Sequence, residues 1–227
     1  MDNADIRDRL VAGIPDHVIF DGWTMKALRG AAADAGLDPG VVVQAFPGGP
    51  VEAAEHFSDF CDRRMLAELE RRGVGAMKIR ERIELAIRVR LELAGDHEVV
   101  RRALALLALP MNGAAAVRTT WRTVDAMWHA AGDDATDINF YTKRALLAGV
   151  YSGTVLFWLG DSSEGGGDTW EFLDRRLADM MRVFQIRGQV EKRLALLPNP
   201  LRLFGIGQQR SGRGGGFGAA RADFLRG

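Results

Sequence analysis

The residue types that most often bind metals or carry out catalysis are few in this chain and far apart. There are four histidines, His17, His56, His97 and His129, and a single cysteine, Cys61. No histidine stands in a Glu-x-x-His or His-x-x-x-His pattern, the spacing that puts two metal ligands on one face of a helix. One cysteine excludes both an intramolecular disulfide and a multi-cysteine zinc site. We therefore interpret the histidines as structural or surface residues and predict no bound metal.

Motifs for nucleophilic catalysis and for nucleotide binding do not support an enzyme either. The sequence has no Gly-x-Ser-x-Gly and no Gly-x-x-x-x-Gly-Lys-Ser/Thr segment. Residues 214–219 match Gly-x-Gly-x-x-Ala, but they follow no predicted strand and overlap a Gly/Arg-rich stretch, residues 208–218, that is typical of disorder. The prediction is a protein that is not an enzyme and needs no cofactor. A lipid-modifying enzyme is the alternative, and it requires a catalytic group that these motifs do not supply.

Length and composition indicate an ordinary globular protein. The 227 residues include 30 Lys and Arg, 30 Asp and Glu, and 47% hydrophobic residues, which is enough to bury a core without disulfides. A net charge of zero argues against a general nucleic-acid binder. Residues 1–20 lack the pattern of a signal peptide, and the longest uncharged apolar run, residues 145–160, is shorter than the roughly 20 residues of a membrane span. We expect a cytoplasmic protein whose contact with membranes is peripheral.

Hydrophobic spacing and helix-boundary residues predict an all-α fold. Helices are expected over residues 24–35, 50–72, 79–93, 97–109, 113–131, 137–159 and 168–187. A short helix is expected to begin at Asp38-Pro39 and to end before Pro47. Asp168 and Glu171 have the spacing of a capping box.

Residues 24–57 have the spacing of a helix-turn-helix and resemble the N-terminal domain of TetR-type regulators, with aromatic residues Phe46 and Phe57 at the matching positions. A DNA-binding surface neutralises phosphates with Lys and Arg, yet neither occurs between Gly30 and Asp62. That stretch instead carries six uncompensated acidic residues: Asp34, Asp38, Glu52, Glu55, Asp59 and Asp62. The prediction is therefore a TetR-like fold without nucleic-acid binding. A TetR-type regulator that binds a hydrophobic ligand is the alternative.

Aromatic and apolar residues gather in the two predicted helices around Trp121 and Phe157. Most of them are expected to form core, because the helix over residues 137–159 is apolar nearly all round. Small residues in that helix fill a core poorly and leave room for an apolar ligand. A lipid pocket is predicted there, with these contact residues: Trp121, Leu146, Gly149, Val150, Gly153 and Phe157.

The C-terminal sequence has an apolar stripe at helical spacing: Val190, Leu194, Leu197, Leu201 and Phe204. Basic residues lie close to it, and this combination is typical of an amphipathic segment on an anionic membrane. Two prolines, Pro198 and Pro200, predict a break near Leu197. Packing against the protein's own domain or against a dimer partner is the alternative.

Several blocks of sequence resemble the family of the coenzyme Q (ubiquinone) biosynthesis accessory protein. They are residues 16–24, 37–39, 46–49, 101–110, 121–128, 131–133 and, most specifically, 136–147 and 168–173. The resemblance covers residues 16–183 and implies a TetR-like fold that has lost DNA binding, a homodimer, and a pocket for isoprenoid lipids or quinone intermediates. It implies no catalysis.

The same resemblance implies a protein partner, the di-iron demethoxyubiquinone hydroxylase. Its contact patch corresponds here to Met127, Asp137, Phe140 and Tyr141. The family's usual Trp is replaced by Phe140, which keeps an aromatic contact but loses the indole donor.

Together these features predict a non-catalytic, lipid-binding accessory protein on the inner face of the cytoplasmic membrane. The expected domains are a helix-turn-helix-like domain over residues 1–60 and a lipid-binding and dimerisation domain over residues 61–187. An amphipathic membrane-binding segment follows over residues 188–207, and a disordered Gly/Arg-rich tail over residues 208–227.

Overall fold

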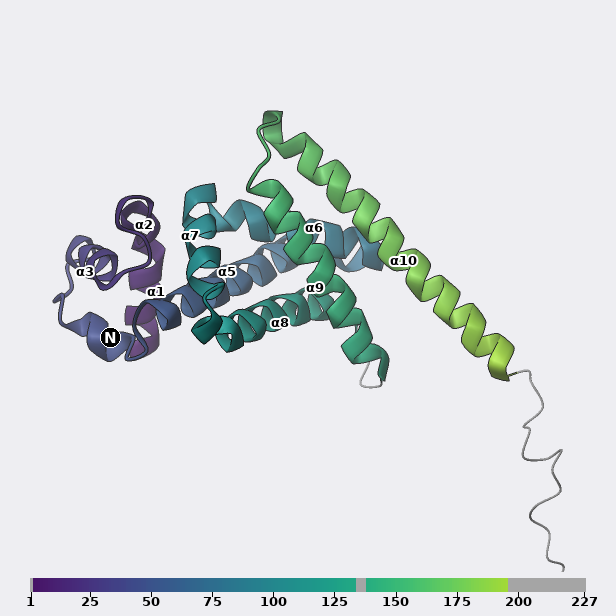
Figure 1. The fold of residues 1–227 in the computed structure, drawn as a ribbon, viewed down its shortest axis with the longest axis horizontal. Helices are drawn as coiled ribbons and strands as arrows, with labels where there is room; N and C mark the ends of the chain where they lie inside the picture. Colours follow the sequence, from purple (N-terminus) through teal and green to yellow (C-terminus); the bar gives the residue numbers. More distant parts are fainter. Residues whose placement is uncertain (1, 134–137, 196–227) are drawn as a thin grey trace, which may run out of the picture. The chain divides into compact units, whose positions relative to one another are not determined.

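The computed structural model describes residues 2–133 and 138–195 (Figure 1), and within these ranges every regular element is a helix. The chain divides into two units, residues 1–183 and 184–227. The packing described below is that of the first unit. The predicted all-α class is therefore confirmed for the described residues.

Four short helices form the N-terminal part: α1 (Asn3–Gly13), α2 (Pro15–Asp21), α3 (Met25–Asp34) and α4 (Val41–Ala45). The hydroxyl of Thr24 accepts a hydrogen bond from the Ala27 N–H at 3.2 Å and caps α3, and Gly36 ends the turn after it with a φ of 67°. Both boundaries are as predicted, because side-chain caps and left-handed glycines act locally. These helices enclose a small core that includes Leu10, Leu28 and Phe46.

Longer helices follow in the chain. They are α5 (Gly49–Arg72), α6 (Ile79–Ala94), α7 (His97–Leu107), α8 (Gly113–Ala130), α9 (Ile138–Trp158) and α10 (Gly167–Ala195), with short 3₁₀ turns at Val74–Ala76, Pro110–Asn112 and Glu164–Gly166. Of α10, residues 167–183 belong to the first unit. In Figure 1, α5, α6 and α8 lie side by side and α9 packs on α8. An apolar cavity lies among α5, α6, α7, α8 and α9.

Two predicted helix starts were wrong. The short helix begins at Val41 instead of Pro39, because the Asp38 carboxylate accepts a hydrogen bond from the Gly40 N–H at 2.6 Å and holds a turn there. Asp168 does not cap α10, which already begins at Gly167. The first turn of α10 is capped from the preceding loop instead, since the Asp161 carboxylate accepts the Thr169 N–H at 2.9 Å.

The predicted domain limits stay a prediction. Helix α5 runs without interruption across residues 60 and 61, and residues 196–227 lie outside the described ranges. Within the described chain, no single helix has the length and apolar character of a membrane span. The bent pair formed by α7 and the segment Pro110–Ala130, which meet at 92°, reaches that threshold only when both parts are counted together.

Candidate functional site

An apolar cavity of about 340 Å³ lies among α5, α6, α7, α8 and α9. Pockets for small molecules usually measure about 300–1,000 Å³, so this cavity has room for a ring or a short chain. Most of its wall is aliphatic: Ala54, Leu91, Ala94, Val100, Ala103, Leu104, Leu107, Ala108, Ala116, Val155 and Leu156, together with Phe57. Alanines from α5, α6, α7 and α8 create the space, because each leaves a gap that a larger side chain would fill.

The cavity wall also contains polar side chains from four helices: Ser58 on α5, Arg90 on α6, Thr119, Thr120 and Thr123 on α8, and Tyr151 and Ser152 on α9. Arg90 is only 5% exposed. Its Nε donates a hydrogen bond to Asp62 Oδ1 at 2.6 Å, and its Nη2 donates one to Ser58 Oγ at 2.9 Å. A buried cation is thus held beside the ligand space by an equally buried carboxylate.

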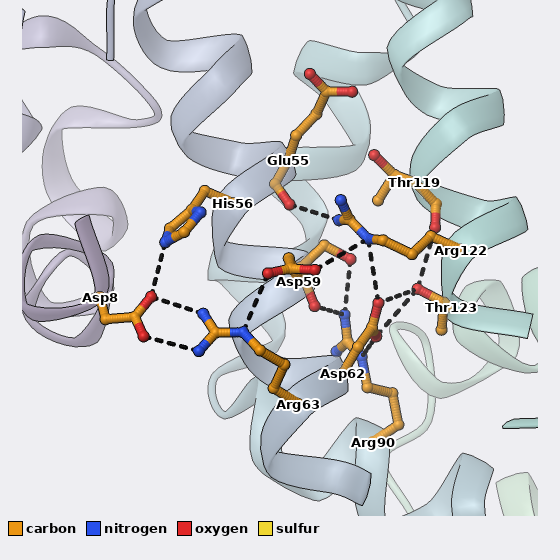
Figure 2. A network of polar contacts seen from close by, with 11 residues as sticks. Asp8, Glu55, His56, Asp59, Asp62, Arg63, Arg90, Thr119, Arg122 and Thr123 are labelled. Carbon is orange, nitrogen blue, oxygen red and sulfur yellow. Dashed lines mark hydrogen bonds and ion pairs between the residues drawn. The ribbon is translucent and has the colours of Figure 1, made fainter. Parts of the chain in front are cut away.

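Asp62 is the centre of a polar network behind the cavity (Figure 2). The Thr123 hydroxyl donates to Asp62 Oδ2 at 2.9 Å, and Arg122 Nε lies 3.7 Å from the same carboxylate. Burial raises the pKa of Asp62, and the positive charge of Arg90 opposes that rise. Burial likewise raises the pKa of Tyr151, again opposed by Arg90. The Tyr151 hydroxyl is therefore un-ionised near neutral pH and able to donate a hydrogen bond.

The residues predicted to contact lipid lie elsewhere. In the part of the chain that the structure describes, the cavity wall includes none of the six: Trp121, Leu146, Gly149, Val150, Gly153 and Phe157. Helix α9 presents Tyr151, Ser152, Val155 and Leu156 to the cavity instead. Five of the six lie on α9, and at 100° per residue they occupy roughly the opposite side of that helix.

The opposite side of α9 packs on the first turns of α10. The rings of Phe157 and Phe172 are stacked, with centroids 4.7 Å apart and planes 10° apart. A Cβ added to Gly153 would lie 3.8 Å from the Phe172 ring. The small residue at position 153 thus accommodates a neighbouring aromatic ring, and lipid contact by these residues stays a prediction.

Two of the predicted partner-binding residues form an aromatic cluster at the start of α9. The Tyr141 ring lies 5.1 Å from Phe140 and 6.1 Å from Trp121, and Tyr141 is 65% exposed. The guanidinium of buried Arg144 lies 3.3 Å from the centroid of the Phe140 ring, so position 140 keeps an aromatic role. Met127 is 0% exposed and lies within the core. Asp137 lies outside the described residues.

The acidic residues between Gly30 and Asp62 have partners, so the expectation that they are uncompensated was wrong. Five of them pair with basic residues or a histidine: Asp34 with His17, Glu52 with Arg7, Glu55 with Arg118, Asp59 with Arg63, and Asp62 with Arg90. Asp38 accepts the Gly40 N–H. Most partners come from α1, α2, α6 and α8, which are distant in sequence and close only after folding.

Metal binding finds no support in the described residues. Across residues 2–133 and 138–195, no group of three or more His, Cys, Asp or Glu side chains is arranged to hold a metal ion. His56 bonds Asp8 at 2.8 Å, and the His97 ring lies 3.8 Å from Trp158. Both histidines are therefore used in packing within the fold.

The predicted membrane-binding residues are only partly covered by the structure. Val190 and Leu194 belong to α10. Leu197, Leu201 and Phe204 lie outside the described residues, as do Pro198 and Pro200.

The fold is that of a TetR-like protein. The chain is similar to the crystal structure of a TetR transcriptional regulator from Nitrosomonas europaea, with a TM-score of 0.63 and 26% sequence identity, over 78% of this chain and 98% of that one. The predicted TetR-like, all-α architecture is thereby confirmed. This chain therefore belongs to the class of TetR-like helical proteins, and it contains an apolar cavity.

Sequence comparison identifies the family to which this chain is related. Residues 113–184, which cover α8, α9 and the start of α10, match the COQ9 family. The chain is 34% identical to the mitochondrial ubiquinone biosynthesis protein COQ9 of Rattus norvegicus, over 78% of this chain and 58% of that protein. It is 32% identical to the Homo sapiens protein of the same name, over 82% of this chain and 61% of that protein.

The chain is thus a homologue of the COQ9 ubiquinone biosynthesis proteins and contains a COQ9 domain. It spans about three-fifths of the length of these two relatives.

Proposed function

We propose that this chain is a non-catalytic accessory protein of ubiquinone biosynthesis, which binds an isoprenoid quinone intermediate and presents it to the demethoxyubiquinone hydroxylase. The observation that carries the proposal is an apolar cavity of about 340 Å³ in a homologue of COQ9. A water-insoluble intermediate has to be shielded between its release from a membrane and its reaction. Burial of each CH₂ group contributes roughly 0.8 kcal/mol to such binding.

The proposed docking surface for the hydroxylase is the aromatic cluster of Trp121, Phe140 and Tyr141. Aromatic side chains are enriched among the residues that dominate binding energy at interfaces. Tyr141 supports this role because it is a large side chain, mostly exposed, that stands beside two other rings. Met127, another member of the predicted patch, lies in the core and is 0% exposed.

The apolar stripe from Val190 to Phe204, with its basic neighbours, would hold the protein on the inner face of the cytoplasmic membrane. A homodimer is proposed on the family resemblance.

Extraction of the purified protein with organic solvent, followed by mass spectrometry, tests the proposal directly. We expect an isoprenoid quinone or one of its precursors. Phospholipid alone would indicate general lipid binding, and an extract without lipid would contradict a lipid-carrier function.

A TetR-type regulator is the second candidate, and the TetR structural neighbour at 26% identity favours it. Against it stand the five residues of α4, Val41–Ala45, none of which is basic. DNA-binding proteins neutralise phosphates with Lys and Arg, and this helix supplies neither. Salt-sensitive binding to duplex DNA in a mobility-shift assay would support the regulator and contradict the carrier.

A further inference from the structure

The cavity wall carries hydrogen-bond donors that make no hydrogen bond within the described chain. Arg90 Nε donates a hydrogen bond to Asp62, and Arg90 Nη2 donates to Ser58. Arg90 Nη1 makes no hydrogen bond within the described chain. The hydroxyl of Thr119 is buried and unpartnered in a residue that is 8% exposed. The Tyr151 hydroxyl also makes no hydrogen bond to any described residue. All three side chains line the cavity.

These donors belong to one neighbourhood. Arg90 on α6 and Tyr151 on α9 line the same cavity, and the positive charge of Arg90 opposes the rise in the pKa of Tyr151 that burial causes. Thr119 and Thr123 are one helical turn apart on α8, and the Thr123 hydroxyl joins them by donating to the Thr119 carbonyl at 3.1 Å and to Asp62. Buried polar groups in folded proteins nearly always have partners, so the unpartnered Thr119 hydroxyl, on a wall that also carries Arg90 and Tyr151, indicates that a ligand supplies the acceptors.

The charge of this neighbourhood selects the kind of acceptor. Asp62 already neutralises Arg90 through a 2.6 Å hydrogen bond, and Arg122 is shared between Asp59 and Asp62. A phosphate or carboxylate would find no unpaired positive charge here, and burying it would be unfavourable. An uncharged oxygen, such as a quinone carbonyl or a phenol, accepts hydrogen bonds without that cost.

The exposure of the wall gives the direction of binding. Leu156 lines the cavity and is 66% exposed, and Ala108 is also an exposed lining residue. The exposed part of the wall thus includes these apolar residues and Ser152, whereas Arg90 and Thr119 lie in its buried part.

We propose that Arg90, Thr119 and Tyr151 bind the ring oxygens of an uncharged quinone or phenol head group, which enters first and leaves its apolar tail toward Leu156. This inference rests on the proposed function, since it assigns the substrate class and orientation of the same cavity. Aliphatic wall residues provide affinity for any apolar chain. The three donors provide the preference for an oxygen-bearing ring.

Two probes with the same tail separate these contributions: decyl-para-benzoquinone and decylbenzene. Their affinities are measured by displacement of a polarity-sensitive apolar dye from the full-length protein. We expect the quinone to bind about 10-fold more tightly than decylbenzene, as two or more net hydrogen bonds provide. Thr119→Val and Tyr151→Phe, which remove one hydroxyl each, should each reduce this ratio about threefold or more and leave decylbenzene unaffected.

Thr154→Val is the matched control, because Thr154 is a buried threonine of α9 whose hydroxyl bonds the Val150 carbonyl and does not belong to the cavity wall. It should leave the ratio unchanged. Equal affinity of the wild type for both probes would overturn the head-group site and leave the carrier function standing. Tighter binding of decyl phosphate than of the quinone would overturn the uncharged head group. If the wild type binds neither probe, the proposed function fails as well.

Discussion

Arg90 on α6 and Asp62 on α5 form a buried ion pair, with 2.6 Å between Arg90 Nε and Asp62 Oδ1, directly beside the apolar cavity. Both side chains are almost fully buried. The pair joins two neighbouring helices, and through Thr123 it also reaches α8. It therefore contributes to the packing of the helices and to the chemistry of the cavity wall at the same time.

Breaking this pair from one side should destabilise the protein strongly. Either Asp62→Leu or Arg90→Met leaves an uncompensated buried charge, and we expect each to lower the free energy of unfolding by about 3–5 kcal/mol. The double variant removes both charges and should recover most of that loss. Urea unfolding at neutral pH measures the free energy of unfolding of the two single variants and of the double variant.

Glu84→Gln, which breaks the more exposed Arg88–Glu84 pair on α6, is the control and should cost much less. A double variant no more stable than the worse single variant would show that the hydrogen bonds of the pair, and not its charges, hold the helices.

Filling the cavity should displace lipid without unfolding the chain. Ala116 on α8 lines the cavity, and Ala116→Phe places a ring in the ligand space. If a ligand has to enter beside this ring, a cost of about 1–3 kcal/mol, as for overpacking in a core, opposes its binding. That cost corresponds to a loss of affinity of about 5-fold to 150-fold. Lipid recovered by solvent extraction, per mole of protein, measures the effect.

Val117→Phe is the matched control, because Val117 is the next residue on α8, is exposed, and does not belong to the cavity wall. Equal amounts of lipid from the two variants would place the bound lipid outside this cavity.

Tyr141 and Met127 should respond differently to truncation. Tyr141→Ala removes an exposed side chain, so stability should change by less than about 0.5 kcal/mol, while affinity for the hydroxylase falls. Met127→Ala empties a site in the core and should cost about 2–5 kcal/mol of stability. Urea unfolding and calorimetric titration with the hydroxylase measure the two effects. An unchanged affinity in Tyr141→Ala would remove the aromatic cluster from the docking surface.

Acidification should destabilise the N-terminal helices in two steps. Burial lowers the pKa of His56, opposed by its hydrogen bond to Asp8, so the unfolded chain binds more protons than the folded one below about pH 6.5. Hydrogen bonds from Arg63 lower the pKa of Asp8, opposed by burial. The stability that Asp8 contributes is present above the ordinary carboxyl value of about 3.9 and is lost as the pH falls through and below it.

We therefore expect the urea midpoint to fall between about pH 7 and 5, and again below about pH 4. His56→Gln should flatten the first step, because the amide can still donate to Asp8 but does not titrate. Asp8→Asn should flatten the second. If His56→Gln shows the same slope as the wild type above pH 5, another group is responsible for the first step.

Much of the helical framework could be predicted because its signals are local. Thr24 caps α3 with its own hydroxyl, and Gly36 and Gly73 adopt the left-handed conformation that ends a helix. Each acts over three or four residues, which a sequence displays directly. The similarity to a known family was also carried by contiguous blocks, of which the COQ9 match to residues 113–184 contains the most specific.

The cavity could not be predicted in the same way, because its wall comes from five helices. Gly149 and Gly153 are small residues within an apolar helix, and for that reason the sequence predicts ligand space beside them. In the structure, Gly153 accommodates the Phe172 ring. The space is made by alanines such as Ala54, Ala94 and Ala116, each an ordinary residue of its own helix. A rotation of α9 by half a turn exchanges one set of lining residues for the other, and only packing against its neighbours sets that rotation.

The charged residues show the same difference between what the sequence determines and what the packing decides. The sequence by itself determined where the acidic residues stand and that no Lys or Arg lies between Gly30 and Asp62. The tertiary structure decided that Asp62 meets Arg90, 28 positions further on, and that Glu55 meets Arg118. A capping bond depends on neighbours along the chain, whereas an ion pair or a cavity depends on which helix faces touch, and that is set by the packing of the whole core.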